Sequence, residues 1–571
     1  MTGPAEVFDL VIVGSGGGSM CAALVARARG KSVLILEKTK FVGGTTSRSG
    51  GAMWMPNNHF MAEDGIADSV ENAMTYLDNV VGTNIEATRG ATRERRLAYV
   101  TEAPNMLKFL IGQGIKFHRY PYWPDYYDDR PGGLEQGRVV IADMFDINEL
   151  GSKKHLLRPN YIPFPAGLEE VMQAPLIKRT WKGKFATVKI GLRMFTQKLR
   201  GKHFIGAGAA LQGRMFKRSL EAGVDIRINA GVERLLTDDA GRVVGVAARV
   251  NGEIQSFSAR DGVLINAGGF ARNQRMRDRF QPGTRAEWSI VCEGDTGEMI
   301  EDMMRLGASV AQMDERVGVQ LTLPPDDREI FPQVMPELAK PHSFIVDQSG
   351  QRYVREAQSY QDFVHDMVER DKTVPAIPSW LVMDSTYVSR YMVSENMPWS
   401  DIPQQWFDTG FIVKGDTLED LAAACKMKPG QLTATAERFN GFVRKGRDED
   451  FQRGDRAYDN FYGDPTNKPS PTLGLVEKGP FYAYQIVPGD IGTTGGVVTD
   501  EHARVLREDG TPIPGLYATG NSTASVMGRA YPGGGSCVGP SFLWGYVAAK
   551  HASEERPAER GSPQWRHPAN A

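Results

Sequence analysis

Small residues near the start of the chain have the types and spacing of a nucleotide-binding turn. Gly14, Gly16 and Ser19 match the fingerprint GxGxxG with serine in its third position. The first glycine allows a tight turn, the second lets the backbone approach a pyrophosphate, and the third position needs only a small side chain. Glu37 follows 23 residues after Gly14, where a carboxylate ending a second strand can bind ribose hydroxyls. The spacing therefore predicts a dinucleotide site.

A second glycine run, at residues 206–213, does not repeat this pattern. No buried strand precedes it, and no acidic residue follows at the right distance, so it is interpreted as a helix start and at most a secondary cofactor contact. Without a second nucleotide site, a separate NAD(P)H-binding domain is not expected. The single site favours a resident flavin.

The elements that must position the fingerprint can be read from hydrophobic patterning. Residues 8–13 (FDLVIV) form a continuous apolar run, typical of a parallel strand covered on both faces. A helix over 20–29 and a strand over 32–36 complete a βαβ unit. The polar segment 43–51 is expected to be a glycine loop, too irregular for a helix. Further strands are expected at 223–229, 243–250, 262–269 and 515–521, and helices at 417–428, 429–445 and 538–549.

Composition excludes several classes of protein. The 571 residues carry 67 Lys and Arg against 69 Asp and Glu, so the chain lacks the basic excess of a nucleic-acid binder. Its four cysteines lie far apart and fit a reducing compartment. Without a secretory leader or an apolar run of 18 residues, a cytoplasmic protein is expected. HExxH, ligand-spaced histidine pairs and GxSxG are absent from the sequence, so neither a metal site nor a serine nucleophile is predicted.

Several stretches together resemble the FAD-dependent 3-ketosteroid dehydrogenases, within the wider fumarate-reductase flavoprotein group. These are VIVGSGGGS at 11–19, LEKTKFVGGTTSRSGGAMWMP at 36–56, LINAGGF at 264–270 and GLYATGNSTASVMGRAYPGGGSCVGP at 515–540. The resemblance spans residues 8–551 and is strongest to the Δ1-dehydrogenases, in particular the membrane-associated type that acts on cholest-4-en-3-one.

The resemblance implies an α/β fold in which a Rossmann-type FAD-binding domain contains an inserted α+β catalytic domain. The expected FAD-binding domain comprises 1–296 and 487–556, the catalytic domain 297–486, and a flexible tail 557–571, with the active site between the domains. The residues that it implies for FAD binding are Gly14, Ser15, Gly16, Gly17, Gly18, Ser19, Glu37, Lys38, Gly43, Gly44, Thr45, Thr46, Ser49, Gly50, Gly51, Val232, Ala267, Gly268, Gly269, Gly520, Asn521, Gly535 and Val538.

Three tyrosines lie in segments that match this family. The PDYY stretch at 124–127 implies that Tyr126 lies in the active site, and the segment 350–363 implies that Tyr360 is the catalytic base. The YPGGG stretch implies that the Tyr531 hydroxyl and the Gly535 N–H bind the substrate ketone. The chain departs from the family at 355 and 357, where it has Arg and Ala instead of the more frequent Asn and Ser.

These residues suit 1,2-dehydrogenation of a 3-ketosteroid. A proton leaves C2, made acidic by the ketone, and a hydride leaves C1 for flavin N5. Donors to the ketone oxygen stabilise the developing charge, and a phenolate base needs a donor of its own, because a free phenol has a pKa of about 10. The alternatives are a Δ4-(5α)-ketosteroid dehydrogenase, a fumarate- or enoate-type reductase, and a non-catalytic flavin- or sterol-binding protein. The electron acceptor is open, with a quinone as one candidate.

Residues 177–203 form a basic amphipathic segment. It has nine Lys or Arg and no acid, and its apolar residues fall on one helical face. The favoured interpretation is a helix lying on an anionic membrane surface, and the alternative is a helix whose apolar stripe packs on the FAD domain. Gly183 and Gly191 weaken the helix prediction. The stripe consists of Trp181, Phe185, Val188, Leu192, Phe195 and Leu199.

Overall fold

The computed structural model describes residues 6–82, 89–162, 164–326, 334–394, 396–398 and 400–554. Its central element is an eight-stranded sheet in which β1 (Glu6–Val13) runs parallel to β2 (Val33–Leu36) on one side and β11 (Glu253–Ile265) on the other. β2 and the last four residues of β1 are apolar and buried on both faces, as are the last residues of β11. The other strands of the sheet are β8 (Asp225–Arg227), β9 (Ala230–Thr237), β10 (Val243–Val250), β19 (Arg504–Leu506) and β20 (Pro512–Ala518).

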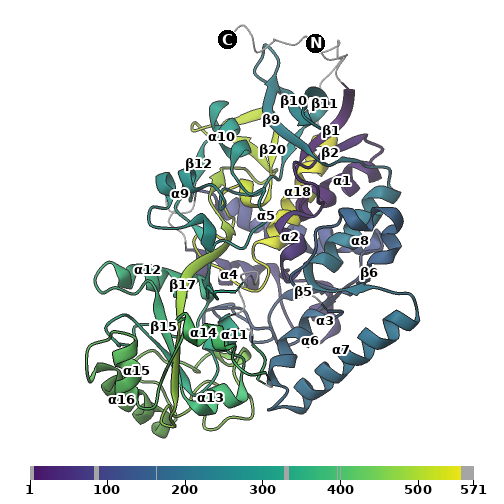
Figure 1. The fold of residues 1–571 in the computed structure, drawn as a ribbon. Helices are drawn as coiled ribbons and strands as arrows, with labels where there is room; N and C mark the ends of the chain where they lie inside the picture. Colours follow the sequence, from purple (N-terminus) through teal and green to yellow (C-terminus); the bar gives the residue numbers. More distant parts are fainter. Residues whose placement is uncertain are drawn as a thin grey trace.

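Helices cover this sheet, and glycines let two of them approach closely. In Figure 1, α1 (Gly17–Ala28) lies beside α18 (Val538–Glu554), although 509 residues separate them in the chain. A Cβ on Gly17 would lie 1.9 Å from the Phe542 ring, and one on Gly18 would lie 2.3 Å from the Ser541 carbonyl oxygen. Residues larger than glycine would therefore separate these helices. Also around the sheet are α5 (Arg93–Gly112) and α8 (Ala207–Glu221).

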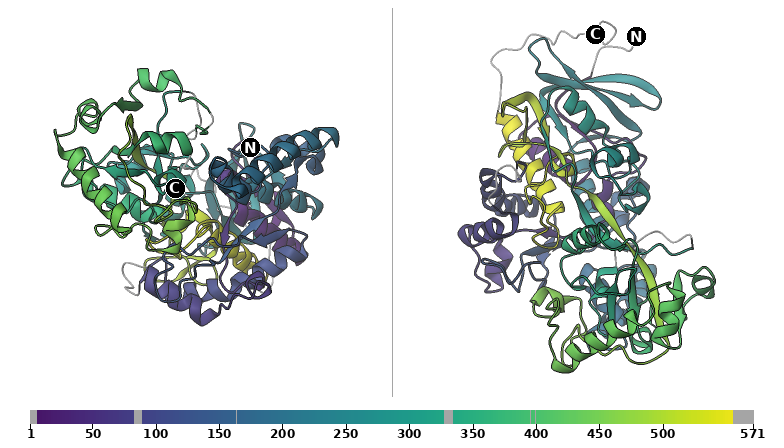
Figure 2. Two further views of the ribbon diagram at one scale, coloured as in Figure 1. Left: turned by 90° about the horizontal axis from the view of Figure 1, so that it is seen from below. Right: turned by 90° about the vertical axis from the view of Figure 1, so that its left-hand side faces the viewer.

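A second layer system is built on a five-stranded antiparallel sheet. The 13-residue strand β17 (Phe481–Thr493) pairs with two strands near its start and with β13 (Arg316–Leu321) near its end, so it runs from this sheet back toward the first one (Figures 1 and 2). The other strands of the five-stranded sheet are β14 (Ser343–Val346), β15 (Ser379–Met383) and β16 (Ile412–Gly415). The helices α12 (Tyr360–Asp371), α15 (Leu418–Ala424) and α16 (Gln431–Lys445) pack around these strands.

Shorter elements and the long peripheral helix α7 complete the fold. A small sheet of β3 (Met53–Trp54), β5 (Val139–Ala142) and β4 (Phe117–Arg119) supports the loop at 120–130. The remaining elements are α2 (Gly44–Arg48), α3 (His59–Glu63), α4 (Val70–Val81), β6 (Phe145–Asp146), η1 (Ile147–Leu156), α6 (Leu168–Gln173), η2 (Ala174–Leu176), α7 (Trp181–Leu199), β7 (Phe204–Ile205), α9 (Gln274–Phe280), η3 (Ala286–Trp288), α10 (Glu298–Arg305), β12 (Val310–Ala311), α11 (Val334–Leu338), α13 (Ser385–Arg390), α14 (Gln404–Asp408), α17 (Ala457–Phe461), β18 (Gly496–Val497) and η4 (Gly520–Ser522).

The predicted βαβ unit and the α/β class are confirmed, but one local prediction is wrong. Segment 43–51 contains the short helix α2 instead of only a loop. Gly43, with φ +114°, turns the chain into this helix, and α2 packs against α8 so closely that a Cβ on Gly208 would lie 2.1 Å from the Thr46 carbonyl oxygen. Packing thus overrides the weak helix propensity of Gly, Thr and Ser. The domain boundaries remain predictions, and the expected tail 557–571 lies outside the described residues.

Candidate active site

One large cavity extends from the carboxyl ends of β1 and β2 to the loops that precede α12 and α18. The space between the atoms that line it is about 1900 Å³, a volume that includes open solvent at its mouth. The carboxyl edge of parallel strands is where α/β proteins place their nucleotides. The cavity has a glycine-rich half beside α1 and an apolar half beside a cluster of tyrosines.

The glycine-rich half has the shape of a dinucleotide cradle. Gly14 has φ +90°, and a Cβ there would lie 2.2 Å from the Asn266 carbonyl oxygen, so only glycine fits the first turn. Gly16 caps α1, whose N-terminus borders the cavity and favours an anionic group such as a pyrophosphate.

Glu37 connects the two loops that form this cradle. Its carboxylate accepts hydrogen bonds from the Ser15 hydroxyl at 2.6 Å and from the Thr39 hydroxyl at 2.8 Å. The same side chain lines the cavity, so it remains beside the space where ribose hydroxyls would lie. Lys38 lines the cavity as well, and its ammonium group donates to Thr296 and Glu298 at 2.6 and 2.7 Å.

Most of the predicted cofactor residues lie on the cavity wall. Those that line it are Gly14, Ser15, Gly16, Glu37, Lys38, Gly44, Thr45, Thr46, Ser49, Gly50, Gly51, Val232, Ala267, Gly268, Gly520, Asn521, Gly535 and Val538.

Five predicted cofactor residues do not line the cavity. Gly17 and Gly18 face α18, and the Ser19 hydroxyl accepts from Asn266 at 2.9 Å, so these three residues pack α1. Gly43 faces α2 and α8, and a Cβ on Gly269 would lie 2.0 Å from the Thr493 hydroxyl. All five act in close packing, and their direct contact with the cofactor stays a prediction.

The structure adds cofactor-site residues that the sequence analysis missed. Asp295 is fully buried on the cavity wall, and one of its carboxylate oxygens has no protein partner. Burial and the nearby Asp490 raise the pKa of Asp295 to about 7. An unpaired buried oxygen in this cradle fits a cofactor that brings hydroxyl or N–H donors. The GDTG turn at 294–297 was the available signal. Other lining residues that were missed are Arg48, Asn266, Cys292, Glu298 and Ser541.

The three predicted tyrosines meet at the far end of the cavity. The Tyr126 hydroxyl lies 3.3 Å from that of Tyr360. The Tyr531 ring centroid lies 5.1 Å from that of Tyr360 and 5.7 Å from that of Tyr126. Tyr126 comes from the loop before β5, Tyr360 is the first residue of α12, and Tyr531 precedes α18. Residues more than 100 positions apart in the chain thus form one cluster.

A buried ion pair holds the loop that carries Tyr126. Asp125 pairs with Arg138 and also accepts from the Trp54 indole N–H at 2.8 Å. Burial raises the pKa of Asp125 to about 6, against the opposing effect of Arg138. The Tyr126 N–H donates to the Pro532 carbonyl at 2.9 Å, which ties this loop directly to the segment of Tyr531.

The surroundings of Tyr360 act in opposite directions on its charge. Burial raises the pKa of the Tyr360 phenol well above its usual value of 10, and Tyr126 and Tyr531 add to that shift. Its place at the N-terminus of the 12-residue helix α12 favours the anion, because the positive end of the helix dipole lies there. The Tyr126 hydroxyl, 3.3 Å away, is placed to donate to a phenolate at this position.

Tyr531 and Gly535 both line the tyrosine end of the cavity. Burial raises the pKa of Tyr531, and the nearby Tyr360 hydroxyl and backbone N–H groups of Cys537 and Gly535 act to lower it. Gly535 has φ +89°, and a Cβ there would lie 2.3 Å from the Ala52 carbonyl oxygen. This glycine is therefore required for the backbone to present its N–H beside the phenol.

The tyrosine half of the cavity is otherwise apolar and aromatic. Among the described lining residues the only Lys and Arg are Lys38 and Arg48, both on the 38–51 segment beside the glycine-rich half. This end is therefore suited to an uncharged ketone rather than a dicarboxylate. Its further lining residues include Trp123, Tyr161, Leu168, Met172, Ile290, Val319, Met335, Pro336, Tyr462 and Ile491.

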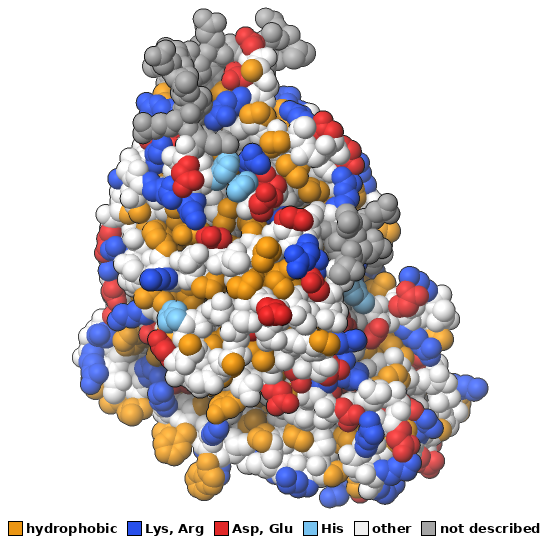
Figure 3. Space-filling view, turned by 180° about the vertical axis from the view of Figure 1, so that it is seen from behind, with side chains coloured by type: hydrophobic (Ala, Val, Ile, Leu, Met, Phe, Trp, Pro, Cys, Tyr) orange, Lys and Arg blue, Asp and Glu red, His pale blue; other side chains and the backbone are white. Residues whose placement is uncertain are grey.

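Helix α7 lies at the edge of the molecule and exposes its apolar stripe (Figure 1). All six stripe residues are 62–77% exposed, led by Trp181 at 77% and Phe185 at 76%. The narrow opposite face, with Gly183, Ala186 and Ile190, is buried. The alternative in which the stripe packs on the FAD domain is therefore wrong. In Figure 3, apolar side chains protrude between Lys and Arg at the lower left, where α7 lies after the half turn.

The base of α7 is fixed to the wall of the cavity. Arg193 donates to the Glu170 carboxylate at 2.6 and 2.8 Å, and Lys189 pairs with the same group at 3.1 Å. Burial by itself raises the pKa of the Glu170 carboxyl, but Arg193, the Gly167 N–H and Lys189 together lower that pKa to about 2. Glu170 belongs to α6, whose Leu168 and Met172 line the cavity. Across the described residues, no helix is long and apolar enough to cross a membrane.

Together, the sheet, the cradle and the adjoining tyrosine cluster define a flavin-dependent oxidoreductase. Comparison with known proteins agrees, since residues 9–538 match the family described as FAD binding domain. The chain is 38% identical to the 3-oxosteroid 1-dehydrogenase of Mycolicibacterium smegmatis, over 98% of this chain and 99% of that protein. It is 34% identical to a 4-oxocyclohexanecarboxylate 2-dehydrogenase of Sinomonas cyclohexanicum, over 96% and 93%.

A solved structure extends this similarity to three dimensions. The crystal structure of 3-ketosteroid Δ1-dehydrogenase from Sterolibacterium denitrificans, in complex with 1,4-androstadiene-3,17-dione, superposes with a TM-score of 0.89. The two are 34% identical, and the match covers 96% of this chain and 100% of that one. The chain belongs to the 3-oxosteroid 1-dehydrogenase family of FAD-dependent enzymes.

Proposed function

We propose that the chain oxidises a 3-oxo-Δ4 steroid to the 3-oxo-Δ1,4 steroid, in the breakdown of sterols or steroids. The observation that carries this proposal is the cluster of Tyr126, Tyr360, Tyr531 and the Gly535 N–H at the end of an apolar cavity. The flat, uncharged ring system of a steroid suits that cavity. Its ketone would lie where the Tyr531 hydroxyl and the Gly535 N–H meet.

Each residue has a distinct role in this proposal. Tyr531 and Gly535 donate to the ketone oxygen as it gains negative charge, which is typically worth ~3 kcal/mol per donor. Tyr360 takes the C2 proton as a phenolate, and Tyr126 donates to the phenolate oxygen. When bound, FAD supplies the acceptor for the C1 hydride. The apolar walls exclude water, which strengthens these electrostatic contributions.

The alternatives differ in what they require of the cavity. A fumarate-type reductase needs cations to hold a dicarboxylate, and the described tyrosine half has none. A Δ4-(5α)-dehydrogenase would share Tyr360 without needing Tyr126. A smaller keto acid, the substrate class named for the Sinomonas relative, would leave most of the apolar wall unfilled.

A substrate panel tests the proposed reaction. The purified flavoprotein is assayed with an artificial electron acceptor on androst-4-ene-3,17-dione, cholest-4-en-3-one, a 5α-reduced 3-ketosteroid, 4-oxocyclohexanecarboxylate and fumarate. Turnover of the 4-ene-3-ketones to their 1,4-dienes is expected. Turnover of the keto acid, or reduction of fumarate, in place of steroid oxidation would refute the proposal. Flavin without any turnover would favour a binding protein.

We also propose that α7 lies on the surface of an anionic membrane. The exposed aromatic stripe and the exposed Lys182, Lys184 and Lys198 beside it fit an interfacial helix. A bilayer is where a water-insoluble sterol ketone is most available, and the link from α7 through Glu170 to the cavity wall brings that source close. A quinone dissolved in the same bilayer is the proposed electron acceptor.

Sedimentation with vesicles tests the membrane proposal. The wild type should sediment with anionic vesicles at low salt and leave them at high salt or in mild detergent. Replacing Trp181, Phe185 and Phe195 by Ser should abolish sedimentation while activity on small steroids persists. Leu97→Ser with Ile254→Ser, which alters exposed apolar residues elsewhere, is the matched control and should still sediment. Wild type that remains in the supernatant at low salt would refute the proposal.

A further inference from the structure

A fourth tyrosine lies directly behind the cluster, outside the cavity wall. Tyr458 on α17 is buried, and its ring centroid lies 4.1 Å from that of Tyr126. The Tyr126 hydroxyl donates to that of Tyr360, and although burial raises the pKa of Tyr126, the neighbouring Tyr458 phenol acts to lower it. Tyr126 therefore lies between the other two phenols, with its ring against the ring of each.

We propose that Tyr458 is a positioning residue that donates to the Tyr126 hydroxyl, and thereby strengthens the hydrogen bond from Tyr126 to the phenolate form of Tyr360. This inference rests on the proposed role of Tyr360 as the base. A hydroxyl that accepts a hydrogen bond becomes a better donor, so a chain of phenols spreads negative charge beyond the first contact. Tyr458 does not line the cavity, so it acts through Tyr126.

The loop of Tyr126 itself fixes the position of Tyr458. Two residues after Tyr126, the Asp128 carboxylate accepts hydrogen bonds from the backbone N–H groups of Ala457 and Tyr458, at 3.0 and 3.1 Å. These are the first two residues of α17, so Asp128 caps the turn that carries Tyr458. The two phenols are held together through their backbones, independently of their hydroxyls.

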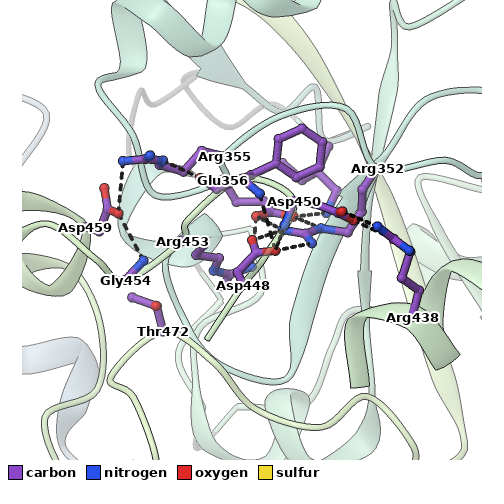
Figure 4. Close-up of polar contacts among 12 residues, drawn as sticks. Arg352, Arg355, Glu356, Arg438, Asp448, Asp450, Arg453, Gly454, Asp459 and Thr472 are labelled. Atoms are coloured by element: carbon purple, nitrogen blue, oxygen red, sulfur yellow. Dashed lines mark hydrogen bonds and ion pairs between the residues drawn. The ribbon is translucent and has the colours of Figure 1, made fainter. Parts of the chain in front are cut away.

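The segment that leads to Tyr360 fixes the other side of Tyr458. The Asp459 carboxylate accepts from the Gly454 N–H at 3.0 Å and lies 3.5 Å from the Arg355 guanidinium. Figure 4 shows Arg355 and Gly454 converging on Asp459. Arg355 also donates to the Phe451 carbonyl at 2.7 Å. At position 355 the chain has arginine instead of the asparagine that is more frequent in the family, and this arginine is the cation that faces Asp459.

A buried ionic cluster supports this anchor. Arg352 pairs with Glu356 and Asp448 at 2.9 and 2.8 Å, and Arg453 lies 3.3 Å from Glu356 (Figure 4). All four side chains are buried. The cluster joins the segment before Tyr360 to the loop before α17, so the base and its supporting phenols belong to one rigid arrangement.

The pH profile of Tyr458→Phe tests the inference, because it keeps the ring and removes only the hydroxyl. Its rate at neutral pH should fall about threefold to tenfold, the usual worth of one neutral hydrogen bond. In the plot of rate against pH, the midpoint of the rising part should move to higher pH by the corresponding ~0.5–1 unit, while the plateau rate and KM stay the same. The near-ultraviolet absorbance of tyrosinate in the holoenzyme provides a second titration of the same group. Tyr353→Phe is the control, because it removes a half-buried hydroxyl that bonds to Ser379 at 2.7 Å, away from the cluster.

Three outcomes separate this inference from the proposed function. A shifted limb in Tyr458→Phe and an unshifted limb in Tyr353→Phe would support it. An unchanged rate in Tyr458→Phe, or an equal loss at every pH with an unmoved midpoint, would overturn it. Tyr360→Phe is assayed beside them, and near wild-type turnover in that variant would show that the proposed base is wrong.

Discussion

Replacing Tyr360 by Phe is the strongest test of the proposed chemistry, because the structure predicts opposite outcomes for folding and for catalysis. The ring is 5% exposed and stays in place when one oxygen is removed. The variant loses the 3.3 Å contact with Tyr126, worth about 0.5–1.5 kcal/mol of unfolding free energy. Tyr126 keeps its ring contact with Tyr458, at a centroid distance of 4.1 Å, and its backbone bond to the Pro532 carbonyl, so its loop stays in place. Fold and FAD content should therefore survive.

Catalysis should fall far more than stability. A general base contributes about 10²- to 10⁴-fold, which corresponds to about 3–5 kcal/mol in the barrier. Even at the ordinary phenol pKa of about 10, only about one phenol in a thousand is ionised at pH 7, and burial raises the pKa of Tyr360 further. The wild-type kcat/KM should therefore rise with pH above neutrality, and the residual rate of the variant should not.

The assay is steroid oxidation with an artificial electron acceptor over a range of pH, with protein concentration set by flavin absorbance. Thermal unfolding of the same samples checks the fold. Tyr353→Phe serves again as the control and should keep the wild-type rate and pH profile. If Tyr360→Phe, with full flavin content, retains more than about a tenth of the wild-type rate, the loss is below the range of a general base, and the reasoning fails.

Three further predictions concern the ketone site, a buried acid and α7. Tyr531→Phe should lower kcat about 10²- to 10³-fold with a normal flavin spectrum, because one donor to the ketone oxygen is lost, and an unchanged rate would remove Tyr531 from the site. Burial raises the pKa of Asp295 to about 7 from 3.8, so the folded protein holds a proton that the unfolded chain has released, and this group's contribution to stability falls as pH rises from about 4 to 7. The free energy of unfolding of Asp295→Asn should therefore rise relative to that of the wild type by up to about 4 kcal/mol between about pH 4 and pH 7. Thermal unfolding at several pH values measures this difference, and a difference that stays constant with pH would contradict the prediction. Replacing Trp181, Phe185 and Phe195 by Ser should change the free energy of unfolding by less than about 0.5 kcal/mol per site in denaturant titrations, because these side chains are 65–77% exposed, and a larger loss would mean that they pack in the fold.

Local sequence determined those features of the protein that depend on short-range chemistry. The turn needs a positive φ and a close backbone approach at Gly14, which only glycine supplies, and the short apolar runs at 8–13 and 32–36 are typical of inner strands. These signals suffice for the α/β class and for a nucleotide beside β1. The resemblance of longer segments to a known family indicated the family and the three tyrosines. Composition alone could not have distinguished these three among the 18 tyrosines of the chain.

Tertiary structure alone decided which residues face the cavity and which face a neighbouring helix. Gly17 and Gly14 are alike in sequence, yet one packs against Phe542 of α18, more than 500 residues away, and the other lines the cradle beside Asn266. The same holds for Asp295, whose burial beside Asp490 raises its pKa. For α7, helical spacing predicted one apolar face, but whether that face meets protein or solvent depends on where the fold places the helix. Such facts are relations between distant segments, and no local pattern encodes them.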